Sequence, residues 1–183
     1  MPDVDGTLVE IAYALDKLGA EGIQLMTSYG ERYPGHPDFA PVALVFVHPL
    51  APVCCAPSLA WIQPALFEFT KDTNRYVFSL LFTGTLARFP DIRFIFCHSG
   101  AAVPVLAGRA AVLGFDREFA DKMPNGIDYG LRTLRYDVAL QANRPALGAV
   151  FAYVPTSQVQ LGSDYPFGTS TDGIRGVEEW SKA

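Results

Sequence analysis

Cysteine is scarce in this chain, and long apolar runs are absent from it. Three cysteines occur among 183 residues, and two of them, Cys54 and Cys55, are adjacent. This set is unsuited to a disulfide framework and fits a reducing cytoplasm, where we expect the protein to reside. Proline, glycine or charge interrupts every apolar run well before the ~18 residues that a membrane span requires. We therefore expect no membrane association.

Positive charge is also scarce. Lys and Arg together number 14 against 19 Asp and Glu, so the net charge is −5. No basic stretch is available to follow a phosphate backbone, which argues against nucleic acid as a partner. The first six residues are acidic and contain Pro2, unlike the basic start and apolar middle of a signal peptide. Half of the residues are hydrophobic, enough for a single domain over residues 1–183 with a sizeable core.

Helical and extended patterns alternate along the chain. The patterns predict helices at residues 7–18, 65–87, 103–119 and 142–152, and strands at 22–27, 43–48, 93–97, 134–140 and 159–161. Residues 29–41 and 49–64 read as proline-rich loops, and the second has the length of a loop that covers an active site. This alternation predicts an α/β fold built from βαβ units around a parallel sheet.

Three of the predicted strands end in, or are followed by, a side chain that can bind a metal ion or transfer a proton. His48 ends one apolar run, His98 ends a second, and Asp164 follows a third. Because all strands of a parallel sheet end at one edge, these side chains should converge there. Two imidazoles and a carboxylate suit zinc. Alternatively, one histidine is a ligand and the other a general acid or base.

Each of these residues also has a purely structural interpretation. His48 could be a core histidine bonded to a backbone carbonyl. Asp164 could cap its loop or the next helix, although a carboxylate after an apolar strand is costly to bury without a cation or several donors. Asp137 could pair with Arg135 or with a neighbouring strand. His36 lies in a predicted loop, where solvent is its expected partner.

Four joined segments carry a family resemblance. They read V-F-V-H-P at 45–49, G-T-L-A-R-F-P-D-I-R-F-I-F-C-H-S-G at 84–100, P-V-L-A-G-R at 104–109, and L-G-S-D-Y-P-F at 161–167. In this order and spacing they resemble the amidohydrolase-related family that contains aminocarboxymuconate semialdehyde decarboxylase and γ-resorcylate decarboxylase. The resemblance covers nearly the whole chain.

The resemblance implies a (β/α)8 barrel with a divalent metal, zinc or alternatively manganese, at its C-terminal mouth. It implies that His48 and Asp164 are metal ligands and that His98 is catalytic, passing a proton to the carbon that loses CO2. It further implies that Arg109, and less directly Arg117, hold a substrate carboxylate across the interface of a homodimer. A guanidinium fork suits that task, since it binds a carboxylate bidentately.

The chain departs from the family pattern in several places. The family begins with a strand that bears His-x-His or Glu-x-His, and this sequence has no such motif. We therefore expect a partial barrel of about five strands that starts after the third. Between residues 22–27 and 43–48 the crossover helix is replaced by a proline-broken loop, so these strands are not expected to pair normally. The chain is also expected to end short of the family's closing helix.

A further departure concerns the loop after His98. There H-S-G-A-A replaces the glycine-richer H-x-G-G, and alanine at a position with positive φ would cost about 1 kcal/mol.

The sequence thus favours a metal-dependent, non-oxidative decarboxylase of a small carboxylated aromatic or unsaturated acid. A lactone or ester hydrolase remains an alternative, because metal-activated water is also a nucleophile. A non-catalytic fragment of the family is the third possibility.

Overall fold

Five parallel strands form the centre of the protein, as the sequence predicts. The computed structural model describes residues 3–29, 32–33, 44–52 and 61–182, so His36 and the Cys54–Cys55 pair lie outside the described residues. The strands are β1 (Ile23–Met26), β2 (Leu44–His48), β3 (Arg93–Phe96), β4 (Arg135–Asp137) and β5 (Val159–Gln160). They pair in chain order, each parallel to the next. With helices along the outer face, this is a five-stranded arc of a (β/α)8-type barrel.

The expectation that the first two strands do not pair normally is wrong. β1 and β2 are parallel neighbours in a continuous register that runs from Ile23 opposite Val45 to Met26 opposite His48. The connection, residues 27–43, is 17 residues long. A parallel crossover needs at least about 10–12 residues, so the length suffices even though the sequence shows no helical pattern there.

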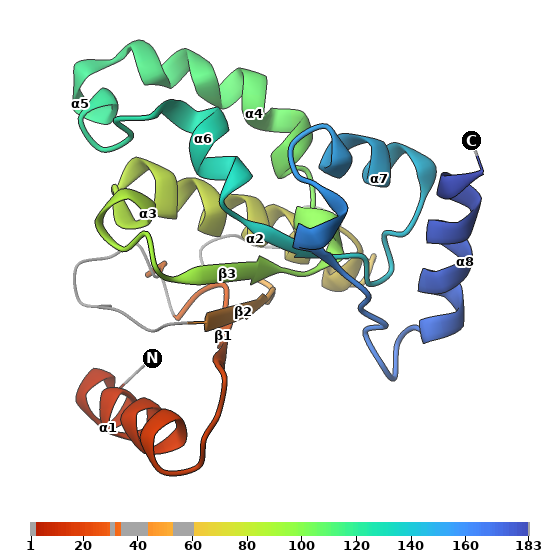
Figure 1. Ribbon diagram of the computed structural model, residues 1–183, viewed down its shortest axis with the longest axis horizontal. Helices are drawn as coiled ribbons and strands as arrows, with labels where there is room; N and C mark the ends of the chain where they lie inside the picture. Colours follow the sequence, from red (N-terminus) through yellow and green to blue (C-terminus); the bar gives the residue numbers. More distant parts are fainter. Residues whose placement is uncertain (1–2, 30–31, 34–43, 53–60, 183) are drawn as a thin grey trace.

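One face of the sheet carries the apolar core. Side chains alternate along each strand, so Val45 and Val47 of β2 and Phe94 and Phe96 of β3 point to the same side and are buried. The helices packed there are α2 (Pro64–Phe82), α4 (Val103–Ala111), α6 (Gly126–Arg132) and α7 (Arg144–Phe151). Tyr76 of α2 meets Phe96 edge to face, with ring centroids 5.4 Å apart. In Figure 1, α4, α6 and α7 lie on one side of the strands and α1 (Val4–Asp16) on the other.

Two predicted helices are broken by local backbone conformation. The helix predicted at 65–87 is α2 followed by the short α3 (Thr85–Arg88), because Gly84 between them adopts φ 74°. The helix predicted at 103–119 divides into α4, a 3-10 turn η2 (Val112–Phe115) and α5 (Arg117–Ala120). Asp116 causes that break, since it is extended and its side chain accepts from the Glu118 N–H to cap α5.

Two helices were not predicted. One is α6, and the other is α8 (Ser170–Ser181), which follows Phe167. Thr169 caps α8 by accepting from the Asp172 N–H. α8 packs on α7, where Phe151 and Trp180 have ring centroids 5.7 Å apart.

No helix in the described parts of the chain combines the length and the apolar character that crossing a bilayer would require.

Replacing Gly176 tests how closely α8 packs against the turn before α7. A Cβ at Gly176 would lie 1.8 Å from the backbone oxygen of Ala142, so Gly176→Ala should lower the free energy of unfolding by about 1–3 kcal/mol. Gly108→Ala in α4 is the matched control, because its Cβ would meet nothing within 4 Å. The control should gain up to about 1 kcal/mol from helix propensity. Urea unfolding of both variants measures the difference, and equal effects would contradict this packing.

Candidate active site

The three strand-end residues predicted from the sequence converge at one edge of the sheet. His48 is the last residue of β2, His98 begins the 3-10 turn η1 (His98–Gly100) after β3, and Asp164 follows β5. Nε2 of His48 lies 3.3 Å from Oδ1 of Asp164. The rings of His48 and His98 are 5.7 Å apart and roughly perpendicular. Residues 116 positions apart in sequence thus share one site.

The hydrogen bond at Nδ1 of His48 determines the tautomer of the ring and the direction in which Nε2 points. Nδ1 lies 3.0 Å from the carbonyl oxygen of Pro49, and a carbonyl only accepts, so Nδ1 carries the proton. In the neutral ring, Nε2 then holds a lone pair that faces the carboxylate of Asp164. Two lone pairs at this distance repel unless a proton or a cation lies between them. The pair is therefore arranged to bind a positive species.

His98 is anchored by β4 and the residues after it. Its Nδ1 donates to the carbonyl of Ala139 at 2.9 Å, which leaves Nε2 available for a proton or a ligand. Its backbone N–H donates to Oδ1 of Asp137 at 3.0 Å, and the Ala139 N–H donates to the same oxygen at 2.9 Å. Arg135 instead donates to the carbonyl of Ser157, so the predicted pairing of Asp137 with Arg135 is wrong, whereas its pairing with a neighbouring strand is confirmed by the bond to His98 after β3.

Burial raises the pKa of Asp137, and the nearby Asp164 adds to the shift, while the two N–H donors and His98 oppose it. Asp137 is therefore a buried carboxyl in the wall of the site that holds the His98 backbone in place.

A cavity of about 620 Å³ opens beside these residues, and its lining is rich in metal-binding groups. His48, Cys97, Asp137 and Asp164 contribute an imidazole, a thiol and two carboxylates, and no Lys or Arg is among the described residues that line it. This donor set fits a divalent cation, which would offset the negative charge of the carboxylates.

Cys97 is the residue that the sequence analysis missed. One ligand atom each from His48, Cys97 and His98 lie within 4.8 Å of one another. Burial, together with the Asp137 and Asp164 carboxylates, raises the pKa of the thiol, which donates to the carbonyl of Val47 at 3.2 Å. Strand parity could have found it, because Cys97 lies two residues after Ile95 and both line the cavity.

Backbone strain concentrates at the same edge. The non-glycine residues with positive φ in the described chain are His98, Ser99, Ala101, Leu140 and Asp164, and all of them follow the ends of β3, β4 or β5. Such conformations persist only where surrounding contacts enforce them, and they cluster at functional sites. Ala101, with φ 56° and ψ −118°, occupies the position where the sequence analysis noted a lost glycine.

The two predicted substrate-binding arginines lie apart from these residues. Arg109 is exposed near the end of α4 and lines a separate, mostly apolar cavity with Phe78, Phe82 and Leu106 among others. Arg117 is exposed at the start of α5. Neither lines the cavity of His48 and Asp164.

Comparison with known proteins identifies the family. The family model described as "Amidohydrolase" matches residues 1–180. The chain belongs to the amidohydrolase family. Among curated proteins, the chain is 32% identical over 181 residues to the 6-methylsalicylic acid decarboxylase of Penicillium expansum, in a match that covers 90% of this chain and 54% of that protein. The chain thus spans about half the length of the curated relatives it matches.

Solved structures show the same fold. The 2,6-dihydroxybenzoate decarboxylase from Rhizobium aligns with a TM-score of 0.79 at 16% identity, over 100% of this chain and 62% of that chain. A 5-carboxyvanillate decarboxylase from Novosphingobium aromaticivorans, complexed with manganese and 4-hydroxy-3-methoxy-5-nitrobenzoic acid, aligns with a TM-score of 0.78 at 20% identity, over 100% and 62% of the two chains.

Ala101→Gly tests the strain in the loop of His98. Glycine adopts positive φ without the Cβ clash that alanine suffers, so the variant should raise the free energy of unfolding by up to about 1 kcal/mol. Ala111→Gly, at φ −58° in the last turn of α4, is the matched control and should lower it by about 1 kcal/mol. Urea unfolding measures both, and a loss of stability in Ala101→Gly would show that the loop is not strained.

Proposed function

We propose that this protein is a metal-dependent, non-oxidative decarboxylase of a small carboxylated aromatic or unsaturated acid. The observation that carries the proposal is the meeting of His48, His98 and Asp164 beside a cavity whose described lining has no cationic side chain. The sequence similarity of this chain to proteins named 6-methylsalicylic acid decarboxylase supports the same reaction class. We also propose that residues 1–183 form one incomplete barrel domain that acts in the cytoplasm.

His48 and Asp164 would hold a divalent ion, because a cation between their facing lone pairs would remove the repulsion. When bound, such an ion supplies a Lewis acid that polarises an oxygen of the substrate. The Pro49 carbonyl keeps the His48 lone pair on Nε2, directed at the site.

His98 would carry the proton. Decarboxylation breaks the bond between carbon and carboxylate, releases CO2 and requires one proton at the carbon that lost it. Nδ1 of His98 is engaged with Ala139, so Nε2 is the nitrogen that can deliver this proton. The buried setting of His98 keeps bulk water from competing for that role.

We further propose a homodimer in which Arg109 and Arg117 reach the substrate carboxylate bound by a second copy. Neither arginine lines the cavity of its own chain, and the surface around Arg109 is apolar, with Val105 73% and Val112 65% exposed. A second copy seated there would cover these side chains.

Zinc is the ion that we propose, although a structural relative was complexed with manganese. Manganese prefers oxygen ligands, whereas a thiolate favours zinc. His48, Asp164 and Cys97 offer an imidazole nitrogen, a carboxylate oxygen and a sulfur beside the same cavity, and zinc takes all three kinds of ligand at about 2.0–2.3 Å. Binding would release the Cys97 thiol proton to solvent.

CO2 release from 6-methylsalicylate and 2,6-dihydroxybenzoate, with zinc or manganese added, tests the function. His98→Gln should lower the rate by about 10²–10⁴-fold while zinc binding changes little, because it removes the proton donor. Asp164→Asn should abolish both zinc binding in equilibrium dialysis and turnover. Asp91→Asn, an exposed carboxylate away from the site, is the control and should match the wild type.

The assay also separates the alternatives. Ring opening of lactones without CO2 release would favour a hydrolase. One-to-one zinc binding that is lost in Asp164→Asn contradicts an inert fragment. If no CO2 appears at any metal concentration while a full-length relative turns over, the decarboxylase proposal fails for this chain.

Cys97→Ala tests the choice of metal. Loss of the thiol should weaken zinc binding by about 10–100-fold but leave manganese binding nearly unchanged, so the preference for zinc falls. Ile95→Ala removes a side chain from the same strand and the same cavity without removing a donor, and it should preserve the preference. Competitive dialysis gives the ratio, and cobalt substitution adds a thiolate charge-transfer band that Cys97→Ala should lose. An unchanged zinc-to-manganese ratio would exclude Cys97 as a ligand.

A further inference from the structure

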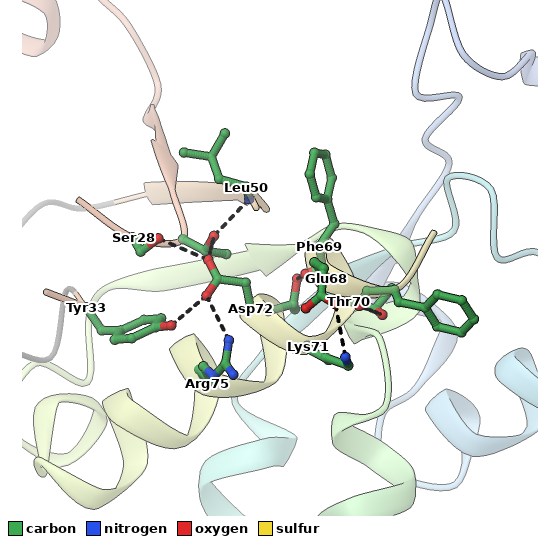
Figure 2. Close-up of polar contacts among 12 residues, drawn as sticks. Ser28, Tyr33, Leu50, Glu68, Phe69, Thr70, Lys71, Asp72 and Arg75 are labelled. Carbon is green, nitrogen blue, oxygen red and sulfur yellow. Dashed lines mark hydrogen bonds and ion pairs between the residues drawn. The ribbon is translucent and has the colours of Figure 1, made fainter. Parts of the chain in front are cut away.

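Asp72 is a fully buried carboxylate outside the cavity of the candidate site. It lies in the middle of α2 with 0% of its surface exposed. It accepts hydrogen bonds from the hydroxyls of Thr27, Ser28 (3.1 Å) and Tyr33 (2.5 Å), and Arg75 lies 3.9 Å away. Figure 2 shows Ser28, Tyr33 and Arg75 directed at this one carboxylate. Asp72 thereby fastens the end of β1 to the helix layer.

Thr27 extends this contact to the strand that carries His48. Its backbone N–H donates to the His48 carbonyl at 3.1 Å, and its Oγ1 accepts from the Leu50 N–H at 3.0 Å. A hydroxyl has a single proton. Because Thr27 gives that proton to Asp72, an oxygen lone pair is left to face Leu50. The carboxylate thus sets the direction of the hydrogen bond that holds the turn after β2.

The group held by Thr27 is the same peptide unit that orients the His48 ring. The Leu50 N–H and the Pro49 carbonyl belong to one planar peptide bond. Thr27 binds the N–H edge, and Nδ1 of His48 donates to the carbonyl edge at 3.0 Å. Rotation of this peptide would carry the carbonyl away from Nδ1, and the ring would lose the contact that keeps its lone pair on Nε2.

We propose that Asp72 and Thr27 are positioning residues that orient the imidazole of His48 through the Pro49–Leu50 peptide. The inference rests on the proposed function, because it assigns these residues a purpose in ion binding. Neither residue lines the cavity of the site, so they act through the peptide and not on the ion. Outer-sphere contacts that fix a histidine ligand commonly contribute 10–100-fold to metal affinity.

Ser28 provides the matched control that separates positioning from stability. It donates to the same oxygen of Asp72 as Thr27 does, from the adjacent residue. Within the described parts of the chain, it makes no hydrogen bond to residues 48–50. Ser28→Ala therefore removes one bond to Asp72 and spares the peptide, whereas Thr27→Val, close to threonine in shape, removes both. Thr27→Ser restores the hydroxyl.

Two measurements test the proposal. In metal-free protein at pH about 8, above the ordinary imidazole pKa, nitrogen NMR of the His48 ring should report a proton on Nδ1 in the wild type, Ser28→Ala and Thr27→Ser. Thr27→Val should shift the ring to a mixture of tautomers. In equilibrium dialysis with zinc alone, Thr27→Val should bind 10–100-fold more weakly, while Ser28→Ala and Thr27→Ser remain within about threefold of the wild type.

The outcomes distinguish this inference from the proposed function. If the wild type binds no zinc, the proposed function fails, yet the NMR comparison on metal-free protein still decides the positioning role. Equal effects of Thr27→Val and Ser28→Ala on the tautomer of the ring and on zinc affinity would mean that the hydrogen bonds to Asp72 only stabilise the fold. That result would overturn the inference. An unaltered His48 ring in Thr27→Val would do the same.

Discussion

Parallel pairing of five short strands is the constraint on which the candidate site depends. β2 pairs with β1 so that His48 stands opposite Met26, and β5 pairs with β4 so that Gln160 stands opposite Asp137. Because side chains alternate along a strand, a slip of one residue would turn His48 toward the helices and bring an apolar neighbour into the site. The register is protected by the core, where such a slip would expose the buried face of each strand. Packing of the apolar face against the helices thus holds the strand register that places His48 and its neighbours in the site.

The two faces of the sheet differ in kind. The helix-covered face is apolar, with aromatic and β-branched side chains in contact with α2, α4, α6 and α7. The opposite face holds Cys97, Asp137 and Asp164 around a cavity whose described lining has no Lys or Arg. The cost of burying a carboxylate falls when a cation or backbone donors stand beside it. Asp137 accepts hydrogen bonds from two backbone N–H groups, whereas Asp164 faces the ring nitrogen of His48. A cation would therefore be stabilised most between His48 and Asp164.

The parts of the structure that the sequence predicted are those with local signals. Each of His48, His98 and Asp164 follows an apolar run, so the parallel arrangement alone was enough to bring them together. Cys97 was missed because its place beside the site depends on strand parity within a run that looked uniformly apolar. Asp72 was missed because a carboxylate in a helical pattern reads as solvated until tertiary contacts bury it. The pairing of β1 with β2 could not be predicted, since it is decided by long-range contacts and not by the pattern of the connecting residues.

The roles of the two histidines are coupled through the third donor. If His98 were an ion ligand, its Nε2 would be occupied and could not carry the proton that decarboxylation requires. Cys97 offers a third donor in place of His98, because its sulfur lies within 4.8 Å of a ring nitrogen of His48 and it lines the same cavity as Asp164. With Cys97 as the third ligand, His98 would stay free. The soft sulfur of Cys97 would then favour zinc over manganese. The unligated Nε2 of His98 would remain able to deliver the proton that decarboxylation requires.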